Sequence, residues 1–155
     1  MNLRLIGPEV EARLSWDGIV AALEAGHRLP LAGIADTFLY RGGDTLLSRA
    51  AWIDGLGLLV KAATVFPGNA AAGRPTVNGA VTLYSDTTGE AAALVDFHLV
   101  TKWKTAGDSL LAARRLARPE SGRILICGAG AVAASMVDAY RSTWPAARIA
   151  IWNRT

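Results

Sequence analysis

Residues 123–155 decide the fold of this chain, and they read RILICGAGAVAASMVDAYRSTWPAARIAIWNRT. A short apolar segment, RILIC, runs into a glycine-rich turn, and a stretch of helical character follows as far as Trp144. Trp144 precedes a proline, and the residue before a proline is disfavoured in helix. A second apolar segment, RIAIW, comes next. We therefore predict a strand, a glycine turn, a helix and a second strand, in that order.

The glycine turn GAGAVA, residues 128–133, predicts a site for the phosphates of a dinucleotide. It follows a strand and opens a helix, which is the context in which a GxGxxG-like pattern carries meaning. The first glycine allows the tight turn, the second lets the backbone approach the pyrophosphate, and Ala133 keeps the helix close to the strand. The helix N-terminus attracts the phosphates. We predict cofactor contacts at Gly128, Gly130, Ala131 and Val132; the alternative is a glycine turn in an unrelated α/β protein.

The second strand ends in Asn153, Arg154 and Thr155, where the adenosine ribose of a dinucleotide is expected. NAD-preferring sites carry an Asp or Glu here, which accepts hydrogen bonds from the ribose 2′-hydroxyl. Asn153 lacks the negative charge that repels a 2′-phosphate, Arg154 can pair with that phosphate, and Thr155 can donate its hydroxyl. We expect NADP, with NAD as the alternative if Arg154 merely lies on the surface.

The remainder of the chain predicts an α/β protein with a β-rich first part. We expect a helix from Ser15, which suits the N-cap, to about Ala25, strands between residues 36 and 100, and a helix from about Lys104 to Ala117. Residues 1–120 then form a mixed, β-rich domain. Residues 121–155 form the first β-α-β of a Rossmann dinucleotide-binding domain.

Composition narrows the classes of protein. The chain is 52% hydrophobic and 19% charged, which favours a folded domain over disorder. The net charge is +3 and no basic run interleaves with aromatic residues, so we expect no nucleic-acid partner. Neither a membrane span nor a signal peptide is indicated, and we expect a cytoplasmic protein. Cys127 should be a small buried residue, and His27 and His98 are too scattered to predict a metal site.

Lysine usage singles out Lys61. The chain has 13 arginines and three lysines, so a lysine that persists against this preference can be one that arginine cannot replace. Lys61 lies inside the apolar segment GLLVKAATVF, where a charge is costly unless it meets an anion or a cavity. Such a lysine can hold a carboxylate, polarise an imine or exchange a proton; the alternative is a lysine that reaches out to solvent.

Four stretches carry a resemblance to a known family: VKAATVFPGNAAAGRPTVNG, SDTTGEAAALVDFHLVTKWKTAGDSLLAARRLARP, GAGAVA and IWNRT. In their order and spacing the chain resembles the ornithine cyclodeaminase/mu-crystallin family from about residue 10 onward. The resemblance implies a β-rich substrate and dimerisation domain joined to a Rossmann domain, and hence a homodimer. Members are about twice as long, so we expect this chain to be the N-terminal half of such a protein.

The resemblance also implies site residues. Lys61 matches the active-site lysine of the family. The family motif RTAA reads KTAG here, so Lys104 stands where the family arginine binds the substrate carboxylate. Thr105 and the amides after it are expected to open a helix and meet a cofactor phosphate, whereas Lys102 is expected on the surface. Arg49, with Arg41 as its alternative, is expected to add a second cation; the family's catalytic acidic residue falls beyond residue 155.

The resemblance implies an NAD(P)-dependent oxidoreductase that acts on the C–N bond of a small, carboxylated amino or cyclic imino acid, similar to ketimine and pyrroline-carboxylate reductases. One alternative is an ornithine cyclodeaminase that uses NAD catalytically, against which Lys104 and the NRT ending argue. The other is a non-catalytic, crystallin-like ligand-binding protein, against which Lys61 argues.

Overall fold

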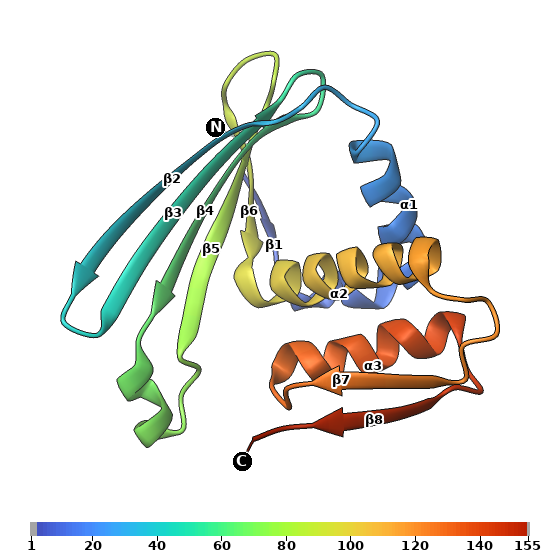
Figure 1. Ribbon diagram of the computed structural model, residues 1–155. Helices are drawn as coiled ribbons and strands as arrows, with labels where there is room; N and C mark the ends of the chain where they lie inside the picture. The colour runs from blue at the N-terminus through green and yellow to red at the C-terminus, as the bar shows by residue number, and fades with distance from the viewer. Residues whose placement is uncertain (1–2, 155) are drawn as a thin grey trace. The chain divides into compact units, whose positions relative to one another are not determined.

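The computed structural model describes residues 3–154 and divides into two compact units. Residues up to 12 together with 27–100 form the first unit, and residues 13–26 together with those from 101 onward form the second. The strands are β1 (Arg4–Ile6), β2 (Gly33–Arg41), β3 (Asp44–Ile53), β4 (Gly57–Val65), β5 (Val77–Tyr84), β6 (Ala91–Asp96), β7 (Arg123–Cys127) and β8 (Arg148–Trp152). The helices are α1 (Trp16–Gly26), α2 (Phe97–Leu116) and α3 (Ala131–Thr143), with 3₁₀ turns at Pro8–Arg13 and Pro67–Ala72 (Figure 1).

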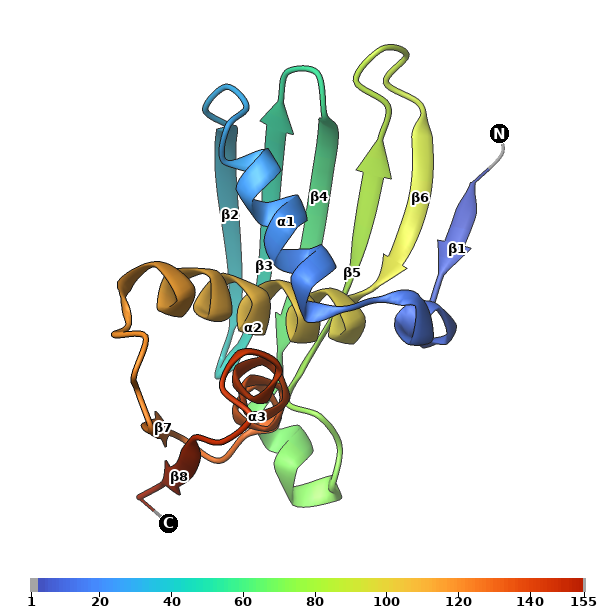
Figure 2. The ribbon, with the colours of Figure 1, turned by 90° about the vertical axis from the view of Figure 1, so that its right-hand side faces the viewer.

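The first unit is a six-stranded sheet with the order β1-β6-β5-β4-β3-β2 (Figure 2). The strands from β2 to β6 pair antiparallel, as expected for a chain that folds back at short turns, and β1 pairs parallel with β6. Gly42 adopts φ +58° in the turn between β2 and β3, a conformation that favours glycine. The expected β-rich region is confirmed, whereas the three-residue β1 is too short to have been predicted.

The register of the sheet brings charged side chains into one row. Asp36 on β2 pairs with Arg49 on β3, Arg49 pairs with Lys61 on β4, and Lys61 pairs with Val81 on β5. Directly paired residues point to the same face of a sheet. The row therefore presents three charges side by side on one face, next to Val81, whose side chain is 1% exposed.

Helix α2 begins at Phe97, earlier than the expected start near Lys104. The Asp96 carboxylate accepts a hydrogen bond from the Leu99 amide at 2.7 Å, which caps the helix at its first turn. Residues 97–100, expected as strand, are therefore helical. The expected helix at Ser15 is confirmed, because the Ser15 hydroxyl accepts from the Gly18 amide at 3.1 Å and α1 follows directly.

The second unit packs α1, α2 and α3 around a small core and carries the two-stranded parallel sheet β7-β8. Its buried centre consists of Val20, Ala106, Leu110 and Ala139. Polar contacts join the same helices: Arg114 on α2 donates to Asp17 on α1 at 2.6 Å and to Thr143 on α3 at 2.7 Å. The predicted strand, glycine turn, helix and strand are all present, and the predicted α/β fold class is confirmed.

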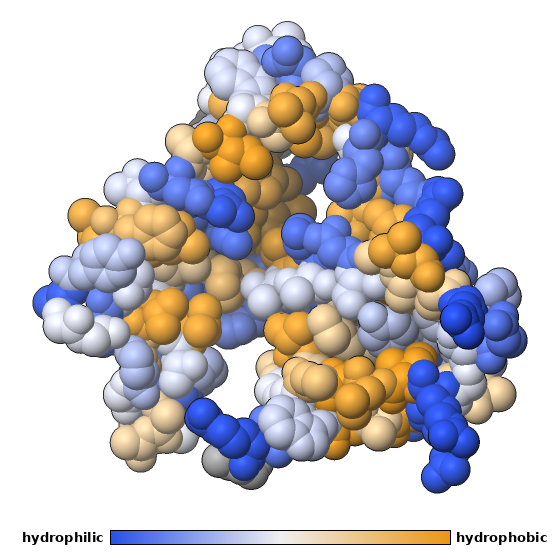
Figure 3. All heavy atoms as spheres, in the orientation of Figure 1, coloured by the Kyte–Doolittle hydropathy of each residue, from blue (hydrophilic) through white to orange (hydrophobic). Residues whose placement is uncertain are grey.

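One face of the β7-β8 sheet is uncovered. Ile126 is 5% exposed, whereas Leu125 and Trp152, which alternate to the other face, are 64% and 59% exposed. Apolar side chains gather over this part of the chain at the lower right of Figure 3. Cys127 belongs to the uncovered face and is exposed. The expectation of a buried cysteine is therefore wrong, because the strand has a helix on one side only.

The compact units do not follow residues 1–120 and 121–155, because α1 and most of α2 pack with α3. The assignment of those two ranges to a substrate domain and a cofactor domain stays a prediction. Between residues 3 and 154, no helix combines the length and the apolar character needed to cross a membrane.

Candidate functional site

The glycine turn between β7 and α3 has the backbone geometry of an anion cradle. Gly128 adopts φ +112°, where a side chain would be strained. Gly130 is extended and directly precedes the first residue of α3, Ala131. The first amides of a helix lack acceptors within the helix and carry its positive dipole end. Gly130 and Ala131 are exposed, so these amides can meet a phosphate from solvent.

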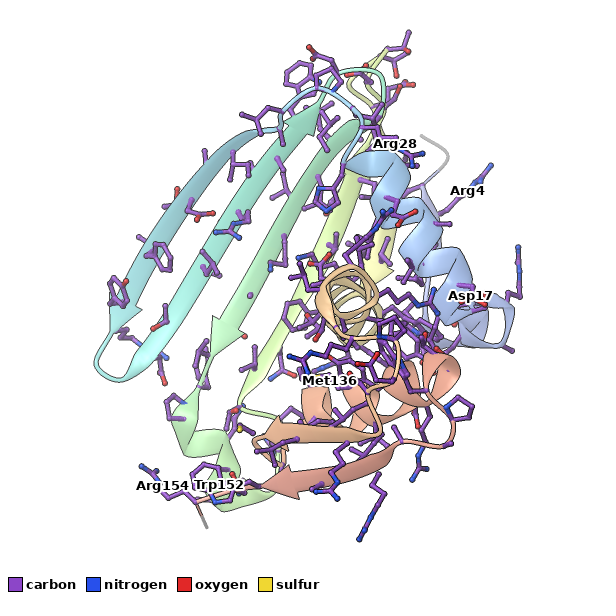
Figure 4. All side chains as sticks on the ribbon, turned by 45° about the vertical axis from the view of Figure 1, so that its right-hand side comes forward. Arg4, Asp17, Arg28, Met136, Trp152 and Arg154 are labelled. Atoms are coloured by element: carbon purple, nitrogen blue, oxygen red, sulfur yellow. The ribbon has the colours of Figure 1, made fainter. Side chains whose placement is uncertain are left out.

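The end of β8 lies beside this turn. The Gly128 amide donates to the Trp152 carbonyl oxygen at 2.7 Å, which fixes the turn against the carboxyl end of β8. Asn153 and Arg154 follow and are exposed, and Figure 4 shows Trp152 and Arg154 together at this end of the strand. Open parallel sheets bind dinucleotides at the carboxyl ends of their strands. The predicted contact at Thr155 lies outside the described residues.

In the first unit, Arg49 and Asp36 form a bidentate ion pair. Arg49 donates from Nε to Oδ1 of Asp36 at 2.7 Å and from Nη2 to Oδ2 at 2.6 Å. The side chains are 47% and 27% exposed, respectively. The hydrogen bonds from Arg49 hold the pKa of the Asp36 carboxyl below its usual value, and the charges of Arg49 and Lys61 act in the same direction against partial desolvation. Asp36 is therefore an anion throughout the neutral range.

Lys61 is half-buried in the same row and lies opposite Arg49 on the neighbouring strand. Among residues 3–154, no hydrogen bond or ion pair engages its ammonium group. Arg41, the alternative to Arg49, alternates to the other face of the sheet, where it pairs with Asp44 at 3.1 Å. Arg49 is thus the arginine that shares a face with Lys61.

The residues expected from the KTAG motif lie in the interior of α2. Lys104 is exposed and forms an ion pair with Asp108 one turn later. Thr105 is the ninth residue of the helix, so its amide bonds within the helix and the expectation that it opens a helix toward a phosphate is wrong. The cause is the cap at Asp96, which starts α2 earlier. Lys102 is half-buried and lies over the Trp103 ring, 5.5 Å from its centroid.

Two groups of predicted residues are thus brought together, each within one unit. Arg49 and Lys61 share a row of the first sheet; Gly128, Gly130, Ala131 and Val132 gather with Asn153 and Arg154 at one end of the β7-β8 sheet. Asp36 was missed by reasoning from the sequence. Pairing residues outward from the Gly42–Gly43 turn places it opposite Arg49, so the signal lay in the hairpin register.

Comparisons with known proteins find similar sequences and structures over most of the chain. The profile of the ornithine cyclodeaminase/mu-crystallin family matches residues 53–155. A Delta(1)-pyrroline-2-carboxylate reductase of Paracoccus denitrificans is 50% identical over 147 residues, which cover 94% of this chain and 46% of that protein.

Among solved structures, an archaeal alanine dehydrogenase dimer with bound NAD is similar with a TM-score of 0.86 and 26% identity, over 99% of this chain and 49% of that one. A lysine cyclodeaminase is similar with a TM-score of 0.78 and 28% identity, over 99% of this chain and 50% of that one. The chain therefore spans about half the length of these relatives.

Proposed function

Because the chain belongs to the ornithine cyclodeaminase/mu-crystallin family, we propose that its protein is an NAD(P)-dependent oxidoreductase that acts on the C–N bond of a small amino or cyclic imino acid. The observation that carries the proposal is the 50% identity, over nearly the whole chain, to a Delta(1)-pyrroline-2-carboxylate reductase. The exposed glycine turn with its helix N-terminus supports a dinucleotide cofactor.

In this proposal a bound nicotinamide dinucleotide would supply hydride-transfer chemistry at the carbon of the C–N bond. The backbone at Gly128, Gly130, Ala131 and Val132 holds its pyrophosphate. Lys61 and Arg49 bind the substrate carboxylate. Lys104 on α2 stays a proposed substrate cation in its own right. Lys61 can also donate a hydrogen bond to the imine nitrogen, which makes the adjacent carbon more electrophilic. The protein's main contribution is to hold the two reactants in reacting geometry.

We propose NADP as the preferred cofactor, read by Asn153, Arg154 and Thr155. Arg154 is exposed next to the glycine turn and can bind a 2′-phosphate with its guanidinium fork, and Asn153 adds no charge that would repel it. The NAD bound to the archaeal alanine dehydrogenase supports a nicotinamide dinucleotide as the cofactor, without distinguishing NADP from NAD.

The test measures reduction of Δ1-pyrroline-2-carboxylate by the full-length protein with NADPH and with NADH. The Arg154→Ala variant should lower kcat/KM for NADPH about tenfold or more, because it removes a charge-assisted hydrogen bond to the 2′-phosphate. Its kcat/KM for NADH should stay within about threefold of the wild-type value. Arg148→Ala, an exposed arginine at the start of the same strand, is the control. Equal or better turnover with NADH sinks the NADP assignment, and the absence of turnover with any cyclic imino acid sinks the reductase.

The second candidate is a cyclodeaminase, which the similarity to a lysine cyclodeaminase favours. Release of ammonia from L-ornithine or L-lysine without net NADH formation distinguishes this reaction from the reductase.

We further propose that the protein is a homodimer, as the alanine dehydrogenase is named. The support is β2, an outermost strand of the first sheet, on which Ile34, Leu39 and Tyr40 are 64%, 62% and 73% exposed. A long apolar edge strand tends to pair with other chains and aggregate unless a partner or another element covers it.

A further inference from the structure

The contact between Asp36 and Arg49 uses only one edge of the guanidinium group. Arginine has five N–H donors, and Asp36 occupies one on Nε and one on Nη2. Three donors remain, two on Nη1 and one on Nη2. One N–H on Nη1 and the remaining one on Nη2 form the end of the group, and that end can bind a second carboxylate with two parallel hydrogen bonds.

The charge of the neighbouring Lys61 affects the orientation of the Arg49 side chain. The two cations occupy directly paired positions on β3 and β4, where like charges repel each other. The Arg49 side chain is 47% exposed, so without an anchor it can turn away into solvent. Asp36 lies on the opposite side of Arg49 from Lys61, in the same row, and its negative charge offsets the repulsion.

We propose that Asp36 is a positioning residue of the substrate site: it grips Arg49 from the side, so that the end of the guanidinium group and the Lys61 ammonium together bind the carboxylate of the substrate. The inference rests on the proposed function, because it assumes that this row meets a carboxylated substrate. It adds a residue that contacts Arg49 and not the substrate itself.

A second ion pair in the same hairpin supplies a matched control. Arg41 and Asp44 also join β2 to β3, through a single contact at 3.1 Å, on residues next to the turn. Removing the Asp44 charge perturbs the hairpin without touching the row of Asp36, Arg49 and Lys61. A general structural effect of charge removal would appear in both variants.

The experiment uses the full-length protein and the variants Asp36→Asn, Asp36→Glu, Arg49→Lys, Asp36→Asn with Arg49→Lys, and Asp44→Asn. For each, kcat and KM are measured with Δ1-pyrroline-2-carboxylate and with NADPH, and binding of L-proline is measured by calorimetry. The proposal predicts that Asp36→Asn raises the KM for the imino acid about tenfold, with the KM for NADPH unchanged. Asp36→Glu keeps the charge but moves it, so its KM for the imino acid should lie between those of the wild type and Asp36→Asn. The Asp44→Asn variant should have the KM of the wild type.

The double variant tests the route of the effect. Lysine cannot offer the two forks of arginine, so in the Arg49→Lys background the Asp36→Asn change should raise KM by less than about threefold. An imino-acid KM and a proline Kd within twofold of wild type in Asp36→Asn, while Arg49→Lys raises them, overturn the inference and leave the proposed function standing. If Arg49→Lys also leaves them unchanged, both the inference and the proposed carboxylate site fall.

Two further outcomes are decisive. Should Asp36→Asn fail to fold, as thermal unfolding would reveal, Asp36→Glu decides, and an unchanged KM in that variant overturns the inference. Should the wild type lack turnover, the proposed reductase activity is wrong. The role of Asp36 is then tested by the Kd for L-proline alone, compared between the wild type and Asp36→Asn. Absence of proline binding to the wild type then overturns both proposals.

Discussion

Single charged residues show how neighbours define a site. Lys61 could be singled out from the sequence because a lysine is rare in this chain and costly inside an apolar strand. Arg49 was chosen on weaker grounds, and the structure supplies the reason for it: it shares a face and a row with Lys61, unlike Arg41. Asp36 could not be chosen in this way, because its importance lies in a contact with a residue 13 positions away.

The dependence of protein stability on pH, on the acid side of neutrality, should reveal the contribution of the Asp36–Arg49 ion pair. Arg49 lowers the folded-state pKa of Asp36 below its ordinary value of 3.8, so the pair stabilises the fold above that value and is lost as the pH falls through the lower folded-state pKa. Asp36→Asn should therefore melt below wild type near neutral pH. The difference between the two melting temperatures should shrink as the pH falls below 3.8 and through the lower folded-state pKa of Asp36.

Melting curves recorded by circular dichroism between about pH 2.5 and pH 7 check this expectation. A difference between the two proteins that stays constant over the whole range would contradict it, because an effect of the amide itself does not titrate.

At the scale of elements, local patterns predicted the kind of element better than its ends. The strand, turn, helix and strand of the final segment were predictable because glycine and proline mark their limits. The start of α2 was not, because Phe97–Val100 are equally compatible with a strand, and the decision falls to a single capping bond from Asp96. That misplacement also misled the interpretation of Thr105.

Gly107 on α2 provides a test of helix packing within the second unit. A Cβ atom here would lie 2.5 Å from Cγ2 of Ile19 and 3.3 Å from Cδ1 of Leu23, both on α1. Alanine favours helix over glycine by about 1 kcal/mol, whereas overpacking costs about 1–3 kcal/mol. Gly107→Ala should therefore lower the free energy of unfolding by about 1 kcal/mol.

Urea unfolding of Gly107→Ala measures this difference, and Ile19→Ala supplies the control background. With Cγ2 of Ile19 removed, the main clash is gone and Cδ1 of Leu23 at 3.3 Å is the remaining close contact. Gly107→Ala should then raise the free energy of unfolding by up to about 1 kcal/mol through its helix preference. The same sign in both backgrounds would rule out the contact as the cause.

At the scale of the molecule, the family and the α/β class were accessible from the sequence because several motifs occur in a fixed order. The grouping of the elements was less accessible. Helix α1 comes early in the chain yet packs with α2 and α3, through Val20 on one side and Ala106 and Leu110 on the other. Such long-range packing depends on side-chain fit, which periodicity along the chain does not reveal.

The proposed homodimer can be tested on β2. Leu39→Lys adds a charge to a strand whose Leu39 side chain is 62% exposed, and it should shift the full-length protein toward monomer in sedimentation velocity at micromolar concentration. Leu116→Lys is the control, because Leu116 is 84% exposed at the end of α2 and lies outside the sheet. Equal sedimentation of both variants and wild type would place the interface elsewhere.

The position of β2 has a consequence for ligand affinity. Within the described residues β2 has a neighbouring strand on one side only, so local opening of the sheet should begin there. Asp36 lies on this strand, so each opening would break its hydrogen bonds with Arg49. The apparent dissociation constant then equals the intrinsic one divided by the fraction of time that β2 is docked. A second strand that closed over the edge would thus tighten substrate binding without touching the substrate.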